Sequence, residues 1–234
     1  WETPYQLWRR KVGLDAPKPE NTAMATGHIL EDGVAQFWAR ETGREIIRNS
    51  RTDFMFVDAQ HHELRVSPDR TYWLGGTRND DNKGILECKT TRLVIDQDDI
   101  PHHWFVQVQM NLGVAGYTQG SLAWLSAAKG FEFGYCDLQF VPDFYEWLKN
   151  ETLRFWHDNV LGGVEPPAVS PQDVILKYDH STAGLTATAD EDTYRAYCEL
   201  KEVRCEIDAL EERKADLEGK LKAAFKDAEA MAYN

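Results

Sequence analysis

The chain has 234 residues, of which 42% are hydrophobic and 12% aromatic, a composition typical of a globular protein and not of a disordered one. This length fits one sizeable α/β core with an appendage. The net charge of -13 counts mildly against nucleic-acid binding, because phosphate contacts need Lys and Arg. A protein that binds nucleic acid can nevertheless need carboxylates at a metal site, and net charge does not describe a single groove.

Two further classes of protein are disfavoured. No apolar run approaches the roughly 20 residues that cross a bilayer, and no basic-then-apolar leader is present, so we expect neither a membrane protein nor a secreted one. The cysteines are scattered and form no CxxC pair, which argues against a disulfide scaffold or a zinc knuckle and fits a reducing cytoplasm. They are Cys88, Cys136, Cys198 and Cys205.

Along the chain, the first predicted elements are helices. A short helix is expected over 4–13, with Pro near its start and Gly after it. A Pro-rich loop over 15–22 precedes a strong helix over 23–42, which Gly43 should end. The apolar residues of this second helix recur at helical spacing. They are Ile29, Leu30, Val34, Phe37 and Trp38.

The middle of the chain predicts a sheet. Short strands are expected near 45–48, 54–57, 63–66, 70–74 and 85–91, with a turn over 75–84 between the last two. A helix over 102–119 follows, and then a hairpin whose strands, 121–126 and 131–140, are joined by Lys129-Gly130. Another helix over 143–161 is expected to open on an Asp143 cap.

The end of the chain predicts an extension. A Gly- and Pro-rich stretch over 162–171 separates the core from a helix that begins near Asp190. We therefore divide the chain into a core (1–161), a linker with a possible extra strand (162–189) and a C-terminal helical extension (190–234). The apolar residues of this helix repeat in coiled-coil fashion, with Lys214 in the skipped position. The pattern fits an intramolecular helical hairpin, an oligomer seam or a docking arm.

The residues that carry chemistry lie on two of the predicted strands. Asp69 ends the motif Ser-Pro-Asp, and Glu87 and Lys89 follow about eighteen residues later. Residues i and i+2 of a strand face the same side, so Glu87 and Lys89 should point into one site while Cys88 points away. Two carboxylates can hold a hard divalent cation such as Mg²⁺, and a nearby lysine can stabilise the transition state of phosphodiester hydrolysis. Alternatively, Asp69 caps a turn and Glu87 forms a surface ion pair with Lys89.

Two helical positions could support this site. Glu31 borders the apolar face of the 23–42 helix, so it is either a pocket residue or a solvated edge. Gln107, in the segment Gln107-Val108-Gln109, could hold a water or a phosphate, or could simply face solvent.

Contacts with the DNA backbone could come from a separate set of basic residues together with one aromatic ring. These candidates are Arg9, Arg10, Lys11, Arg70 and Trp104.

Several motifs occur in a specific order between Trp1 and about Phe140. They are WETPYQLW (1–8), AMATG (23–27) followed by Glu31, SPD (67–69), LECK (86–89) and QVQ (107–109). With these motifs the chain resembles the YqaJ-type viral recombinases, which are related to lambda exonuclease. The resemblance implies an α/β, restriction-endonuclease-like core in which a central mixed β-sheet is flanked by helices, followed here by the long C-terminal helical extension.

The resemblance also implies roles for individual residues. Asp69 and Glu87 would be metal ligands together with the backbone carbonyl of Cys88, and Lys89 would be the catalytic lysine. Glu31 and Gln107 would support the active site. The implied cofactor is Mg²⁺, with Mn²⁺ as an alternative and two ions per site.

The implied activity is digestion of the 5′-ended strand of linear duplex DNA to mononucleotides, leaving 3′ overhangs for recombination. The implied partners are DNA ends, a single-strand annealing protein and further copies of this chain in a ring of three subunits. The implied location is the cytoplasm of a bacterial host.

The family usually has Gly where this chain has Arg70, and the family's 5′-phosphate-binding segment before Trp1 is absent from the sequence. The alternatives are a Cas4-like nuclease, whose iron–sulfur cysteines these do not match, and a non-catalytic DNA-binding or assembly protein on the same fold.

Overall fold

The computed structural model describes residues 2–47, 55–76, 78–79, 82–128 and 130–226. These divide into two compact units, Trp1–Lys177 and Tyr178–Asn234. Some predicted features lie partly outside the described residues: Trp1, the ends of two short strands at residues 48 and 54, parts of the 75–84 turn, Lys129 of the hairpin turn, and residues 227–234 of the extension.

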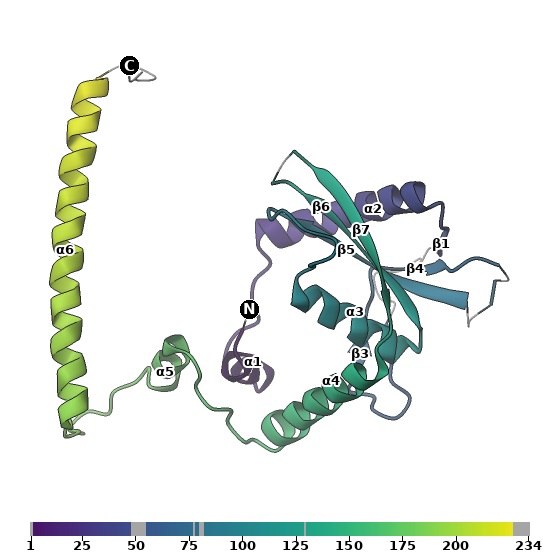
Figure 1. Ribbon diagram of the computed structural model, residues 1–234. Helices are drawn as coiled ribbons and strands as arrows, with labels where there is room; N and C mark the ends of the chain where they lie inside the picture. Colours follow the sequence, from purple (N-terminus) through teal and green to yellow (C-terminus); the bar gives the residue numbers. More distant parts are fainter. Residues whose placement is uncertain (1, 48–54, 77, 80–81, 129, 227–234) are drawn as a thin grey trace. The chain divides into compact units, whose positions relative to one another are not determined.

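The first unit is built on a five-stranded mixed sheet in the order β1-β4-β5-β6-β7 (Figure 1). The β5–β6 pair is parallel, and the other three pairs are antiparallel. This arrangement confirms the predicted fold class. The strands are β1 (Ile46–Ile47), β4 (Arg70–Trp73), β5 (Lys83–Thr91), β6 (Gln119–Ser126) and β7 (Glu132–Gln139). A separate hairpin pairs β2 (Phe56–Val57) with β3 (Arg65–Val66).

Two helices cover opposite faces of the sheet (Figure 1). Helix α2 (Thr22–Thr42) packs on the face that carries Leu86, Cys88 and Ala123. Helix α3 (His102–Ala115) packs on the face that carries Ile85, Leu122 and Trp124. Successive side chains of β5 point to opposite faces of the sheet, so the predicted alternation along this strand was correct.

The apolar face of α2 is narrower than its sequence indicates. Val34, Ala35 and Trp38 are buried, whereas Ile29 is 78% exposed. Phe37 is half-exposed and packs beside Phe133, with ring centroids 4.9 Å apart. The helix ends at Gly43, which adopts a left-handed φ of 68° as expected of a C-cap glycine.

Two predicted helix boundaries in the first unit were wrong. Helix α3 stops at Ala115, not near residue 119, because Gly116 takes a left-handed φ of 72° and its N–H caps the helix. Helix α4 (Pro142–Arg154) has Val141 at its N-cap, with Asp143 inside the first turn, where a negative charge favours the helix dipole. The predicted end of this helix at residue 161 is correct, although its last part is a π-helical segment, η2 (Phe155–Leu161).

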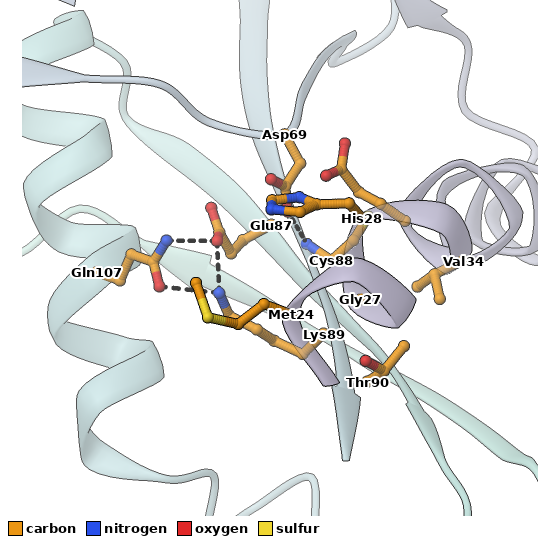
Figure 2. Close-up of a pocket in the computed structure, with 11 residues that line it drawn as sticks. Met24, Gly27, His28, Val34, Asp69, Glu87, Cys88, Lys89, Thr90 and Gln107 are labelled. Atoms are coloured by element: carbon orange, nitrogen blue, oxygen red, sulfur yellow. Dashed lines mark hydrogen bonds and ion pairs between the residues drawn. The ribbon is translucent and has the colours of Figure 1, made fainter. Parts of the chain in front are cut away.

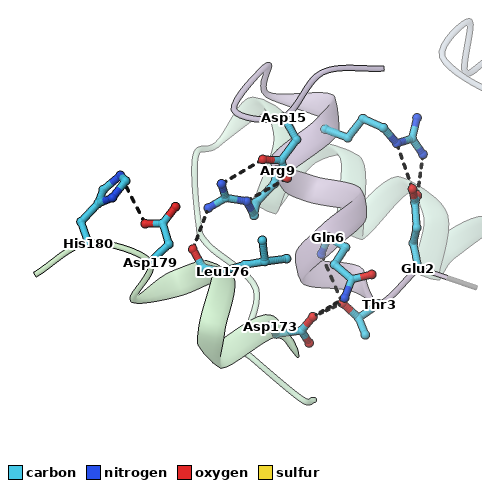
Figure 3. A network of polar contacts seen from close by, with 10 residues as sticks. Glu2, Thr3, Gln6, Arg9, Asp15, Asp173, Leu176, Asp179 and His180 are labelled. Atoms are coloured by element: carbon cyan, nitrogen blue, oxygen red, sulfur yellow. Dashed lines mark hydrogen bonds and ion pairs between the residues drawn. The ribbon is translucent and has the colours of Figure 1, made fainter. Parts of the chain in front are cut away.

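The segment that follows η2 contains a helix and no strand. Helix α5 (Pro171–Lys177) is held to α1 (Pro4–Lys11) by the buried carboxylate of Asp173 (Figure 3). This carboxylate accepts hydrogen bonds of 2.8 Å each from the Thr3 hydroxyl and the Gln6 amide. The prediction of a possible extra strand in 162–189 was therefore wrong. The buried polar group of this segment, the Asp173 carboxylate, holds two helices together and does not extend the sheet.

The second unit contains one long helix, α6 (Glu191–Phe225). Asp190 caps its start, accepting a 2.8 Å hydrogen bond from the Thr193 N–H. The helix runs without interruption over 35 residues, so the prediction of an intramolecular helical hairpin within 191–225 was wrong. In the described part of the chain, no helix has both the length and the apolar character that a membrane span requires.

Two helical glycines should respond oppositely to alanine. A Cβ at Gly113 would overlap the Tyr145 ring where α3 packs on α4, whereas a Cβ at Gly33 in α2 meets no atom within 4 Å. We expect Gly113→Ala to destabilise the fold by about 1–3 kcal/mol through overpacking. Gly33→Ala should stabilise it by up to about 1 kcal/mol through helix propensity. Urea unfolding of both variants measures this, and equal shifts in both would contradict the packing of α3 on α4.

Candidate active site

The site begins with the register between β4 and β5. Arg70 pairs with Leu86 in this antiparallel ladder, so Asp69, one residue earlier, lies opposite Glu87. Residues opposite one another in a ladder have neighbouring side chains. The Asp69 carboxylate also accepts a 2.7 Å hydrogen bond from the backbone N–H of Cys88, which fixes it beside β5. Two carboxylates from separate parts of the sequence thus meet at one edge of a pocket.

Glu87 is the buried centre of the site, with a relative exposure of 2%. Its Oε1 lies 2.6 Å from Lys89 Nζ, and Lys89 also donates to Gln107 Oε1 at 2.9 Å (Figure 2). The Gln107 amide donates to the same Oε1 of Glu87, which closes a triangle. The second oxygen, Oε2, accepts from Asn111 Nδ2 at 3.1 Å. Strand β5 and helix α3 therefore hold the carboxylate from both sides.

These side chains line one pocket of about 490 Å³. Its opposite wall is the N-terminal half of α2, where residues one turn apart face the sheet (Figure 2). Glu31 lies on this wall, so it is a pocket residue and not a solvated edge. All five proposed catalytic residues line the pocket: Glu31, Asp69, Glu87, Lys89 and Gln107.

Burial and mutual repulsion leave the carboxylates poorly compensated. Burial, together with the charge of Glu87, raises the pKa of Asp69 to about 7, although the Cys88 N–H acts in the opposite direction. Burial also raises the pKa of Glu87, against the lowering effect of Lys89. An acidic site whose ionised form is disfavoured by burial is suited to a cation that neutralises it.

The donor set fits a divalent cation of the magnesium type in its chemistry. It offers two carboxylates, with Cys88 beside them in the lining, and oxygen is the ligand atom that such ions prefer. Among the described residues, no group of three or more His, Cys, Asp and Glu side chains is arranged to hold a metal. A zinc-type site is therefore not present there, whereas two carboxylates completed by backbone and water oxygens remain a sufficient set for Mg²⁺.

Arg70, on β4, contacts two residues that line this pocket. Its guanidinium donates to Glu31 Oε1 at 2.5 Å, to the backbone carbonyl of Asp69, and to Asp32 at 3.5 Å. Both partners in the Arg70–Glu31 pair have side chains 23% exposed. Arg70 therefore stands between Glu31 and the main chain at Asp69, and a contact with DNA would require it to exchange these partners.

The other DNA-binding candidates do not gather at the pocket. Arg9 forms a bidentate pair with Asp15, and Arg10 pairs with Glu2 (Figure 3). Lys11 lies over the Trp156 ring, with Nζ 5.9 Å from the centroid. Trp104 is 7% exposed within the core cluster beneath α3, so we no longer expect its ring to contact DNA.

Asn111 is the site residue that the sequence analysis missed. It lies one helical turn after Gln107 and is buried, with 4% exposure. The available signal was a polar residue four positions on from Gln107, inside the apolar stripe of α3. Gln109, which is also buried, serves a different purpose, since its amide bonds the backbone of Gln139 and Val141 and so anchors α3 to the end of β7.

The mixed sheet, its two covering helices and the Asp–Glu–Lys cluster on its interior strands β4 and β5 define the class of restriction-endonuclease-like proteins. The model of the YqaJ-like viral recombinase domain matches residues 1–118, and the chain belongs to this family. The match contains every residue of the candidate site.

Solved structures and curated proteins were also compared with the chain. The crystal structure of LHK-Exo, an alkaline exonuclease from Laribacter hongkongensis, is 14% identical over 75% of this chain and 81% of its own, with a TM-score of 0.46. The structure of LHK-Exo in complex with dAMP is 15% identical over 66% of this chain and 75% of its own, with a TM-score of 0.45. No curated protein matches this sequence.

Proposed function

We propose that this protein is a Mg²⁺-dependent exonuclease that digests the 5′-ended strand of linear duplex DNA to mononucleotides. The observation that carries this proposal is the meeting of Asp69, Glu87 and Lys89 at one pocket, with Gln107 bonded to two of them. A protein that only binds DNA has no need of two carboxylates, one of them buried, beside a lysine. The strand polarity and the mononucleotide product rest on the likeness to the YqaJ-type recombinases.

Asp69, Glu87 and the Cys88 carbonyl would hold the metal, with Mn²⁺ as an alternative to Mg²⁺. Bound there, the cation would polarise the scissile phosphate and lower the pKa of an attacking water. Glu87 is oriented for this role by Asn111 on one oxygen and by Lys89 and Gln107 on the other.

Lys89 would supply the positive charge that the transition state needs. Its ammonium is held by two partners, the Glu87 carboxylate and the Gln107 carbonyl oxygen, so it is positioned before substrate binds. A fixed cation stabilises charge that develops on the phosphate oxygens without reorganising during the reaction. Gln107, at the exposed end of the triangle, would orient the attacking water through its amide.

The proposed setting follows the family. The substrate would be the ends of double-stranded DNA in the cytoplasm of a bacterial host, and the 3′ overhangs would pass to a single-strand annealing protein. A homotrimeric ring around the DNA is part of the same proposal. These steps would place the enzyme at the start of recombination by strand annealing.

The test is an end-labelled degradation assay on linear duplex DNA. We would compare 5′-phosphate and 5′-hydroxyl ends, labels at the 5′ and 3′ termini, and reactions with Mg²⁺, Mn²⁺ or EDTA. Mononucleotides released from the 5′-ended strand only when metal is present support the proposal. Duplex binding without release in either metal would instead favour the non-catalytic DNA-binding protein, and release from the 3′ terminus would reject the polarity.

Arg70 should set the metal requirement of this site. Its guanidinium lies against Glu31 and the Asp69 carbonyl, so it repels a cation bound beside them. We expect Arg70→Gln to lower the half-saturating Mg²⁺ concentration a few-fold, on the order of 1 kcal/mol of Coulomb energy. Arg70→Lys, which keeps the charge, is the matched control. A Mg²⁺ titration of initial rates measures both, and a higher Mg²⁺ requirement in Arg70→Gln would contradict this reading of Arg70.

A further inference from the structure

Helix α6 carries an apolar stripe from Leu200 to Leu221. The large residues of the stripe are 42–62% exposed, and no residue of α6 is buried. The stripe consists of Leu200, Val203, Ile207, Leu210, Leu217 and Leu221. Helices in proteins gain most of their stability from the packing of an amphipathic face, so a stripe of this kind needs a covering surface.

The charges beside the stripe change sign along the helix. On one flank, seven residues apart, stand Glu199, Glu206, Arg213 and Lys220. The N-terminal half of this flank is therefore acidic and the C-terminal half basic. A helix with this polarity is complementary to a second copy of itself that runs in the opposite direction.

We propose that α6 is a self-association surface, on which a second copy of this chain docks its own α6 in antiparallel orientation. In the register that the charges favour, Ile207 of one copy faces Leu210 of the other, and Leu200 faces Leu217. In this register the flanking residues also meet, with Glu206 beside Arg213 of the second copy and Glu199 beside its Lys220. At about 1.5 Å per residue, the paired segment from Thr193 to Ala224 is about 48 Å long.

Like charges, at Lys214 and between Glu206 and Glu211, disfavour a parallel pair. In a parallel pair, Lys214 of one copy would face Lys214 of the other inside the seam, and Glu206 would face Glu211. In the antiparallel pair, Lys214 faces Val203, so its aliphatic stem covers the apolar side chain while the ammonium reaches water. The lysine that interrupts the stripe thus selects the direction of the pairing.

The first test compares the molar mass of the full chain with that of two variants by sedimentation equilibrium. Leu210→Lys places a charge at the centre of the seam and should weaken association by about 100-fold or more, which halves the mass of the assembly. Ala209→Lys makes a similar change at a position off the seam on the same helix, and should leave the mass unchanged. If the first unit forms an oligomer by itself, α6 pairing joins two such oligomers, and loss of the pairing still halves the mass of the assembly.

The second test determines direction by reversing charges. Glu206→Arg should weaken an antiparallel pair, since it meets Arg213, but should strengthen a parallel one, where it meets Glu211. Adding Arg213→Glu to Glu206→Arg should restore the antiparallel pair.

Three results would overturn the proposal. An unchanged mass in Leu210→Lys means that the stripe is not covered by a second copy. A drop in Tm of that variant at constant mass means that its own chain covers the stripe. Stronger association of Glu206→Arg means that two copies pair in parallel. None of these outcomes depends on nuclease activity.

Discussion

Replacing Lys89 with alanine is expected to lower the rate of DNA degradation by about 10²–10³-fold, the loss typical of removing one fixed group that stabilises a transition-state charge. The ammonium lies 2.6 Å from Glu87 Oε1 and 2.9 Å from Gln107 Oε1, so nothing else in the pocket can take its place without moving. The rate would be measured in single-turnover reactions at saturating Mg²⁺, which isolates the chemical step from product release.

Lys83→Ala is the matched control. Lys83 lies on the same strand, β5, but its ammonium sits over the Trp73 ring and does not line the pocket. We expect this variant to keep the wild-type rate, and both variants to bind duplex DNA with similar affinity. If Lys89→Ala retains at least half of the wild-type rate, or if Lys83→Ala loses as much, Lys89 is not the catalytic lysine.

The sequence predicted the parts of this site that depend on local periodicity. Strand alternation placed Glu87 and Lys89 on one face and Cys88 on the other, and the structure has them so. The end of α2 at Gly43 also follows from a local signal, since a left-handed residue after an apolar helix favours glycine.

The parts that were missed depend on side chains far apart in the sequence. The pairing of Arg70 with Glu31 spans 39 residues, and no spacing rule connects a strand residue with one on an earlier helix. The burial of Trp104 was open for a similar reason, because an aromatic residue on an amphipathic helix can face the sheet or a ligand until the packing is known. Asn111 resembled a polar interruption of an apolar face, and only its contact with Glu87 shows its purpose.

The second large effect is expected from Asp69→Asn, which should act in opposite directions on activity and on stability. The amide removes the charge of a proposed metal ligand, so metal-dependent degradation should fall by at least about 100-fold. The amide oxygen can still accept the hydrogen bond from the Cys88 N–H, which keeps the local structure. Loss of metal binding would appear as loss of the Mg²⁺-dependent rise in Tm that wild type should show.

The same substitution should stabilise the metal-free protein at alkaline pH. The folded pKa of Asp69 is raised to about 7, above the roughly 3.9 of an unfolded chain, chiefly by burial and then by repulsion from Glu87. A group of this kind contributes its full stability below the unfolded pKa and loses it as pH rises through the folded pKa. In EDTA at pH 8, Asp69→Asn should therefore be more stable than wild type by on the order of 1–3 kcal/mol, and the gap should close below about pH 4.

Asp137→Asn gives the opposite sign and serves as the control. Its carboxylate is paired with Arg44 and accepts from Ser121, so its pKa lies below the usual range and its charge stabilises the fold at neutral pH. Urea unfolding from pH 3 to pH 8 in EDTA should show Asp137→Asn less stable than wild type at pH 8 and Asp69→Asn more stable. If both variants are destabilised at pH 8, the ionised Asp69 carboxylate is compensated within the protein itself. A cation would then have no unmet charge to neutralise at this pocket, and the argument for a metal site from burial and repulsion would fail.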